Sequence, residues 1–211
     1  MKFRLPMLMV LVVMPLYSVS TLATELPSGS ENLRPYIQVK PVEGEQGIVR
    51  GFFSPSCRFS RQYLHFFGNL ANTLPANRKF VYTPVVNKLD GVAYAMSFYA
   101  VELYYPAYVP NYIAASMQGV QDLGLAVQKW GVIDRIGQAA HVPVPVSRLV
   151  NAHLPQIEKE VQRTITLQSK LSITNTPTIA VDGTYIITPE FTRGDPELFS
   201  KLTNAVISMS E

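Results

Sequence analysis

The hydrophobic pattern of the chain changes from that of a strand to that of a helix at its single cysteine, Cys57. The run just before it at 48–54, IVRGFFS, is short, apolar and rich in β-branched and aromatic residues, which favours a buried strand. After it, one helical face ending near Pro75 is predicted from apolar residues spaced by four and three, at Phe59, Tyr63, Phe66 and Leu70. Cys57 is therefore predicted at a strand-to-helix junction.

The N-terminal segment has the pattern of a cleaved secretory signal. Lys2 and Arg4 precede an apolar run at 5–16, and small residues follow at 18–23. The apolar run is shorter than the roughly 18 residues that a helix needs to span a bilayer, and no second long apolar run follows it. We expect cleavage near Ala23, export of the mature chain, and no stable membrane insertion after cleavage.

The composition of the remaining chain excludes several classes of protein. Removal of Lys2 and Arg4 lowers the formal charge from +3 to +1, and without a basic cluster we expect no nucleic-acid partner. The three histidines are widely separated, so no metal or cofactor site is expected. One cysteine cannot close an internal disulfide, so stability must come from packing. An unpaired cysteine in an exported protein is buried and inert, bonded to another molecule, or chemically used.

The middle of the chain predicts one further strand and then a long helical region. The run KFVYTPVV at 79–86 reads as a strand, and Pro84 indicates a sheet edge or a bulge near its end. From 88 to 171 the strand signal disappears. Helical faces in this region are predicted at Val92, Met96, Tyr99 and Leu103, at Tyr112, Ser116 and Val120, and at Ile157, Val161 and Ile165.

The C-terminal part predicts a hairpin followed by a helix. Asp182 and Gly183 separate two β-rich runs, at 178–181 and 184–187, and this pair is a strong signal for a tight turn. Asp195 and Pro196 are suited to begin a helix. Its predicted buried face consists of Leu198, Leu202, Val206 and Met209.

This order of elements, with three local motifs, resembles the DsbA family of periplasmic thiol:disulfide oxidoreductases. The motifs are VKPVEGEQGIVRGFFSPSC around the cysteine, MQGVQ in the helical region and TPTIAVDGTYIITPE before the last helix. The resemblance implies an α/β, thioredoxin-like fold with an inserted α-helical domain, located in the periplasm. It implies a signal peptide at 1–23, a thioredoxin-like domain at 24–87 and 172–211, and an inserted helical domain at 88–171.

The resemblance also implies a site with three catalytic positions, Cys57, Ser60 and Pro177. Cys57 is the attacking sulfur, Ser60 stands where the family's CxxC motif has its second sulfur, and Pro177 is a cis proline in a loop that faces Cys57. The implied substrate-binding positions are Thr176, Arg58 and Phe59. A sulfur in the first turn of a helix favours the thiolate, which is the nucleophilic form. Backbone groups before the cis proline can pair with an extended peptide.

Two residues depart from the family's pattern. Ser60 removes the second sulfur, so the chain cannot transfer an internal disulfide of its own. Gly51 occupies the position of a buried acidic residue that the family's oxidases use in proton transfer. We therefore expect monothiol chemistry, in which Cys57 forms a mixed disulfide with a substrate protein. Ser60 could then donate a hydrogen bond to the Cys57 thiolate.

The sequence leaves three functions open. The first is a thiol:disulfide interchange protein that acts on exported proteins with thiols or disulfides and is recycled by glutathione or a membrane redox partner. The second is a redox-inactive binding or chaperone module for secretion or surface assembly. The third is a relative of the kappa-type glutathione transferases, which use a serine in a similar motif. In the simplest structural interpretation, Cys57 and Phe59 are only core residues.

Overall fold

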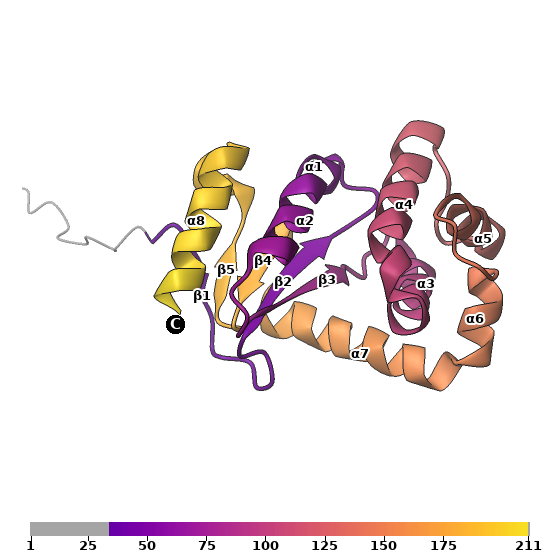
Figure 1. The fold of residues 1–211 in the computed structure, drawn as a ribbon, viewed down its shortest axis with the longest axis horizontal. Helices are drawn as coiled ribbons and strands as arrows, with labels where there is room; N and C mark the ends of the chain where they lie inside the picture. Colours follow the sequence, from indigo (N-terminus) through magenta and orange to yellow (C-terminus); the bar gives the residue numbers. More distant parts are fainter. Residues whose placement is uncertain (1–33, 211) are drawn as a thin grey trace, which may run out of the picture. The chain divides into compact units, whose positions relative to one another are not determined.

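A computed structural model of the chain describes residues 34–210 (Figure 1). The predicted signal peptide at 1–23 lies outside these residues. The described chain contains a five-stranded sheet in the order β1-β5-β4-β2-β3, with eight α-helices and two short 3-10 helices around it. The strands are β1 (Ile37–Gln38), β2 (Ile48–Phe53), β3 (Lys79–Pro84), β4 (Thr178–Val181) and β5 (Tyr185–Ile187).

The strand β2 lies between β4 and β3 in the sheet, and it runs parallel to β3 and antiparallel to β4. Parallel neighbours need a crossover connection, which α1 (Arg58–Gln62) and α2 (Leu64–Thr73) provide. The strand β3 is an edge strand, and Pro84 is its last residue, opposite Phe53. The predicted edge position of Pro84 is therefore confirmed, since proline cannot donate a ladder hydrogen bond.

The strands β4 and β5 form the predicted hairpin, with Asp182 and Gly183 at its turn. Both turn residues have positive φ angles, 53° and 60°. This geometry is typical of the tight turns that match the twist of antiparallel strands. Glycine is also required for space, because a Cβ atom at Gly183 would lie 2.6 Å from the Cβ atom of Glu45.

The chain between β3 and β4 is helical, and most of these helices lie beyond the β3 edge of the sheet (Figure 1). It consists of α3 (Gly91–Tyr104), a 3-10 turn at Pro106–Tyr108, α4 (Val109–Leu123), α5 (Trp130–Ala139), α6 (Val146–Ala152) and α7 (Leu154–Lys170). We call α3–α7 the inserted helices. The sequence pattern did not predict α6 as a separate helix. The long helix α7 leads the chain back to the sheet.

The last helix, α8 (Pro196–Met209), follows a 3-10 turn at Pro189–Thr192. Its start was predicted correctly. The Asp195 carboxylate accepts hydrogen bonds from the backbone N–H groups of Glu197 and Leu198, at 2.9 and 3.0 Å. These bonds satisfy two of the donors that a helix start leaves free.

Helices cover both faces of the sheet. On one face, Val49 and Phe53 of β2 belong to a buried cluster with Phe67 of α2 and Phe199 of α8. On the other face, Phe52 belongs to a second cluster with Leu167 of α7 and the residues that follow that helix. The alternation of β2 side chains between these two clusters holds the end of the strand, and thus the segment leading to Cys57, in a fixed place.

Several predicted helix faces were wrong. On the face predicted after Cys57, Tyr63 and Leu70 are buried, but Phe59 is 51% exposed. The helix breaks at Tyr63, and in the following helix Phe67 is fully buried while Phe66 is only partly buried. In α8 the end residues Leu198 and Met209 are half exposed, and the buried face is Phe199, Thr203, Val206 and Ile207. Helix α8 carries two overlapping apolar faces, and packing on the sheet selects one. Val92 and Leu103 of α3 and Ile165 of α7 are also exposed, although the sequence predicted them on buried faces. Helix α3 is buried around most of its circumference, so the spacing of its apolar residues does not show which side packs on the rest of the protein.

Within residues 34–210, no helix is both long enough and apolar enough to cross a membrane.

Candidate functional site

Cys57 lies where the sequence predicted it, between the end of β2 and the start of α1. It is the N-cap residue of α1, its backbone is extended, and its side chain is partly exposed. Its backbone N–H donates to the carbonyl of Ser54 at 3.1 Å, which closes the tight segment between strand and helix. We call residues 54–57, with the sequence SPSC, the cysteine loop.

The loop before β4 faces this sulfur. The Thr176–Pro177 peptide bond is cis, as the resemblance implied. The Cys57 thiol donates a hydrogen bond to the backbone carbonyl of Thr176, with 3.1 Å between sulfur and oxygen. Two segments that are 119 residues apart in the chain therefore meet at the sulfur.

The Ser60 hydroxyl is hydrogen-bonded at the end of the strand that precedes the cysteine loop. The Ser60 side chain is fully buried, and its hydroxyl oxygen accepts a hydrogen bond from the backbone N–H of Ser54 at 3.2 Å. Among the hydrogen bonds of the described chain there is none between Ser60 and Cys57. Ser60 thus ties the first turn of α1 to the end of β2. Because its oxygen only accepts in this contact, the hydroxyl proton is not used by it, and donation to a Cys57 thiolate stays a prediction.

The position of Gly51 cannot hold an acidic side chain in this packing. A Cβ atom there would lie 2.7 Å from the ring of Phe80 and 3.1 Å from the ring of Phe67. Two aromatic side chains therefore occupy the space into which a side chain at 51 would point. This arrangement explains the glycine in terms of close packing.

Phe59 and Arg58 are both exposed at the start of α1. The Arg58 guanidinium lies 5.3 Å from the centre of the Phe59 ring. The interpretation of Phe59 as a core residue is wrong, since half of its side chain is exposed. It lines a pocket together with the cis proline, and its role in substrate binding stays a prediction.

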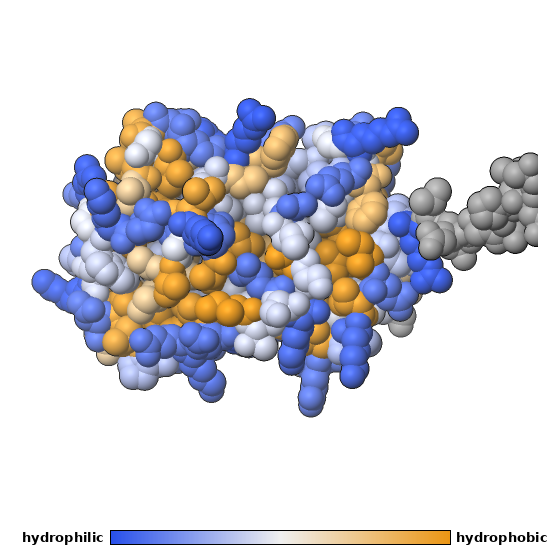
Figure 2. Space-filling model, turned by 180° about the vertical axis from the view of Figure 1, so that it is seen from behind, coloured by the Kyte–Doolittle hydropathy of each residue, from blue (hydrophilic) through white to orange (hydrophobic). Residues whose placement is uncertain are grey.

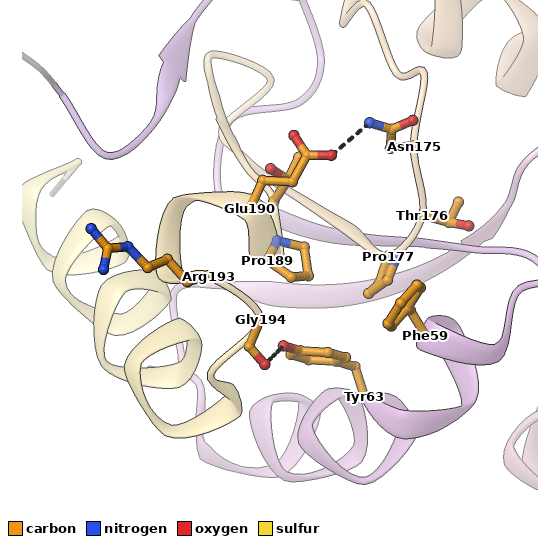
Figure 3. A pocket seen from close by; sticks show the side chains of 10 residues that line it. Phe59, Tyr63, Asn175, Thr176, Pro177, Pro189, Glu190, Arg193 and Gly194 are labelled. Carbon is orange, nitrogen blue, oxygen red and sulfur yellow. Dashed lines mark hydrogen bonds between the residues drawn. The ribbon is translucent and has the colours of Figure 1, made fainter.

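The pocket, which we call the Phe59 pocket, has a volume of about 390 Å³. Figure 3 shows Phe59 of α1 and Tyr63, which follows that helix, on one side and Pro177 and Pro189 on the other. The Tyr63 hydroxyl donates to the carbonyl of Gly194 at 3.0 Å. Burial, and then the nearby Asp195 carboxylate, raise the pKa of Tyr63, so it remains a neutral donor. Thr176 also lines the pocket.

The polar rim of the Phe59 pocket was not predicted from the sequence. The Asn175 amide donates to the Glu190 carboxylate at 3.0 Å across the pocket edge (Figure 3). These residues come from the loop before β4 and the turn before α8, and only the fold brings them together. The motif TPTIAVDGTYIITPE contains Glu190 but gives no sign of this contact.

Two inserted-helix residues that the sequence did not single out bind the cysteine loop. The Gln121 amide, near the end of α4, donates to the carbonyl of Pro55 at 2.8 Å and to that of Cys57 at 3.2 Å. Asp90, just before α3, is fully buried and accepts from the Ser54 hydroxyl and from the Ser56 backbone N–H. The sequence signal for Gln121 was its place in MQGVQ.

A surface ion pair also joins α1 to α4. Arg61 and Asp122 form two hydrogen bonds, at 2.6 and 3.0 Å. Hydrogen bonding and charge raise the pKa of Arg61 and lower that of Asp122. Both side chains are exposed, so the pair contributes little to stability.

Searches of known proteins found similarity in solved structures alone. No protein-family model matches the sequence, and no curated protein matches it significantly. The DsbA of Pseudomonas aeruginosa is similar with a TM-score of 0.72 and 17% identity, over 83% of this chain and 92% of that one. The oxidoreductase DsbA of Xylella fastidiosa is similar with a TM-score of 0.69 and 18% identity, over 82% of this chain and 94% of that one.

A third similar structure is a complex of Proteus mirabilis DsbA with a non-covalently bound peptide, PWATCDS. Its TM-score is 0.67 at 19% identity, over 83% of this chain and 95% of that one. At identities this low, the likeness concerns the fold. The chain has the DsbA-like thioredoxin fold with a helical insertion.

Proposed function

We propose that this chain is a periplasmic, DsbA-like thiol:disulfide interchange protein that acts through one nucleophilic cysteine. The observation that carries the proposal is the position of the Cys57 sulfur. It is partly exposed at the start of α1 and lies 3.1 Å from the Thr176 carbonyl, beside the Phe59 pocket. A substrate disulfide bound along this loop would lie within reach of the sulfur.

The proposed reaction begins with attack of the Cys57 thiolate on one sulfur of a substrate disulfide. The substrate S–S bond breaks, the leaving sulfur departs as a thiolate and takes up a proton, and a mixed disulfide with Cys57 forms. If a second thiol of the same substrate attacks that substrate's bonded sulfur, a rearranged disulfide forms and Cys57 is released. This route is an isomerisation without net oxidation.

An external thiol provides a reductive route. Glutathione attacks the Cys57 sulfur of the mixed disulfide and releases the substrate as a dithiol, which leaves Cys57 bonded to glutathione. A second glutathione then attacks the glutathione sulfur, which restores the Cys57 thiol and forms oxidised glutathione. A membrane redox partner with two thiols could supply the same two electrons. A dithiol oxidase route is not proposed, because Ser60 has no sulfur.

Substrate binding would use the Phe59 pocket and the backbone around Thr176. The pocket places exposed apolar surface next to the sulfur, and an extended peptide can pair with the loop backbone. Leu89, which precedes Asp90, and Leu123, at the end of α4, are each 68% exposed and add apolar surface to the inserted helical region. Figure 2 shows that apolar side chains also occur, interspersed with polar ones, on the face seen from behind.

One observation favours a redox-inactive binding module as a second candidate. The exposed apolar residues Phe59, Leu89 and Leu123 can hold an unfolded chain whether or not Cys57 reacts. A kappa-type glutathione transferase gains no such support. Cys57, rather than a serine, stands at the N-cap of α1 where the SPSC motif ends, and Ser60 in the first turn of the helix is fully buried.

Trapping of mixed disulfides tests the proposal. Exporting cells that express the chain are quenched with N-ethylmaleimide, and the protein is purified under denaturing, non-reducing conditions. We expect disulfide-linked adducts with exported proteins that disappear on reduction and in Cys57→Ser. In solution, wild-type Cys57 should react with a peptide disulfide faster than free cysteine does. A rate no faster than free cysteine, together with partners that co-purify equally well with Cys57→Ser, would support the binding module instead.

A further inference from the structure

The cysteine loop is held by side chains of the inserted helices along its whole length. Asp90 accepts from the Ser54 hydroxyl and the Ser56 N–H, and Gln121 donates to the carbonyls of Pro55 and Cys57. Each of the four loop residues thus has a hydrogen bond to one of these two side chains. The thioredoxin-like part adds the contact of Ser60 with the Ser54 N–H.

The bonds of Asp90 also fix the direction of the loop hydroxyls. The Ser54 hydroxyl donates its proton to the Asp90 carboxylate. The Ser54 oxygen lies 2.9 Å from the Ser56 oxygen, and it can therefore accept the proton of the Ser56 hydroxyl. Asn87 donates to the same carboxylate at 3.0 Å, which orients it. Asp90 is fully buried, so these bonds are made away from competing water.

The bonds of Gln121 act on the other side of the loop. Its amide donates to the carbonyl of the nucleophile itself and to the carbonyl of Pro55, two residues before it. A single donor group that joins the Pro55 and Cys57 carbonyls restricts the backbone rotation that would turn the sulfur away from Thr176. The Arg61–Asp122 pair lies next to it and holds α1 against α4.

We propose that Gln121 and Asp90 are positioning residues for Cys57, so that the inserted helices set the orientation of the attacking sulfur. This inference rests on the proposed function of Cys57. Disulfide exchange needs the attacking sulfur in line with the S–S bond that breaks, and a loop held from both sides meets that condition before substrate binds. The inserted helices thereby act on the chemistry although neither residue touches the sulfur.

The main test compares Gln121→Met with Gln118→Met. Methionine has a similar length and suits a helix, but it cannot donate to the two carbonyls. Gln118 is an exposed glutamine of the same helix, with no hydrogen bond to the cysteine loop, so its variant controls for composition. Three quantities are measured in each variant: the thermal midpoint, the hydrogen exchange of the Ser56 and Cys57 amides, and the pH profile of reaction with a peptide disulfide.

We expect Gln121→Met to lower the plateau of the rate profile by about fivefold or more, through lost orientation of the nucleophile. Amide exchange in the cysteine loop should accelerate, while the thermal midpoint stays close to that of Gln118→Met. Asp90→Asn, which changes one acceptor oxygen to a donor, should lower the same plateau. If it does not fold, Ser54→Ala removes the same bond from the loop side.

The outcomes separate this inference from the proposed function. If wild type reacts with the peptide disulfide no faster than free cysteine does, the proposed function is rejected. The amide hydrogen exchange of the cysteine loop would then be the test of whether Gln121 positions this loop. A fast wild-type rate that is equal in Gln121→Met and Gln118→Met would reject the positioning and keep the function. Equal amide hydrogen exchange of Ser56 and Cys57 in Gln121→Met and Gln118→Met would also reject the positioning role.

Discussion

The thiol of Cys57 and the backbone carbonyl of Thr176 lie 3.1 Å apart, although 119 residues separate them in the chain. This contact joins the start of α1 to the start of β4, next to the Phe59 pocket. It places a lone sulfur against backbone groups with which an extended peptide could pair. The chemical consequences of this arrangement can be measured by substitutions around it.

Phe59→Ala should weaken substrate binding without unfolding the chain. Half of the side chain is exposed, so we expect a stability change below about 1 kcal/mol. Loss of an aromatic wall of the pocket should raise the peptide concentration at half-maximal mixed-disulfide formation by about fivefold or more. Phe191→Ala serves as the control, because Phe191 is partly exposed and does not line the pocket. Equal effects of both substitutions would show that the pocket does not bind the peptide.

Ser60→Cys should create an internal disulfide with Cys57. The residue lies in the first turn of α1, three positions after the N-cap residue, and its side chain is already buried. We expect a mass loss of two hydrogens under oxidising conditions that dithiothreitol reverses. Ser60→Ala controls for the lost hydrogen bond to Ser54, which should cost about 1 kcal/mol in either variant. A variant that stays a dithiol in oxidant would show that the two positions are too far apart to bond.

Gly51→Ala should destabilise the fold through overpacking. The new Cβ atom would lie 2.7 Å from the Phe80 ring, and we expect a loss of about 1–3 kcal/mol in the free energy of unfolding, measured with urea. Gly131→Ala is the matched control, since nothing lies within 4 Å of its added Cβ atom. That change in helix α5 should be neutral or stabilising by up to about 1 kcal/mol. Similar midpoints for the two variants would contradict the packing explanation for Gly51.

Glu102 should make stability depend on pH. Burial raises the pKa of this carboxyl from 4.5 to about 7, against the opposing effect of Arg50 and Lys79. The folded state therefore holds the proton more tightly than the unfolded chain, and stability is lost as pH rises from about 4.5 to 7. This loss is on the order of 3 kcal/mol.

The measurement is urea unfolding of wild type and Glu102→Gln at pH 4.5 and 8. We expect the variant to gain stability relative to wild type at pH 8 and to differ little at pH 4.5. Glu158→Gln, an exposed glutamate of α7, should show no such pH-dependent difference. If the free energies of unfolding of Glu102→Gln and wild type differ by the same amount at both pH values, Glu102 is not the source of the pH dependence.

Local signals in the sequence were sufficient for the order of elements and for the place of Cys57. Each of these signals depends on residues within a few positions of one another. They are the change in hydrophobic spacing at Cys57, the Asp182–Gly183 turn and the helix cap at Asp195. The resemblance added the cis Thr176–Pro177 bond, which the structure contains. Such features follow from backbone preferences, and those act over short distances along the chain.

The surroundings of the sulfur could not be obtained in that way. Apolar spacing predicted a buried Phe59, whereas half of this side chain is exposed, and the bond between Ser60 and the Ser54 N–H has no signal in the sequence. Asp90 and Gln121 reach the cysteine loop only because the inserted helices pack against it. The sequence by itself determined a strand, a lone cysteine and a helix, because period and turn chemistry are local. Tertiary structure alone decided what touches the cysteine, because those contacts join distant segments through side-chain packing.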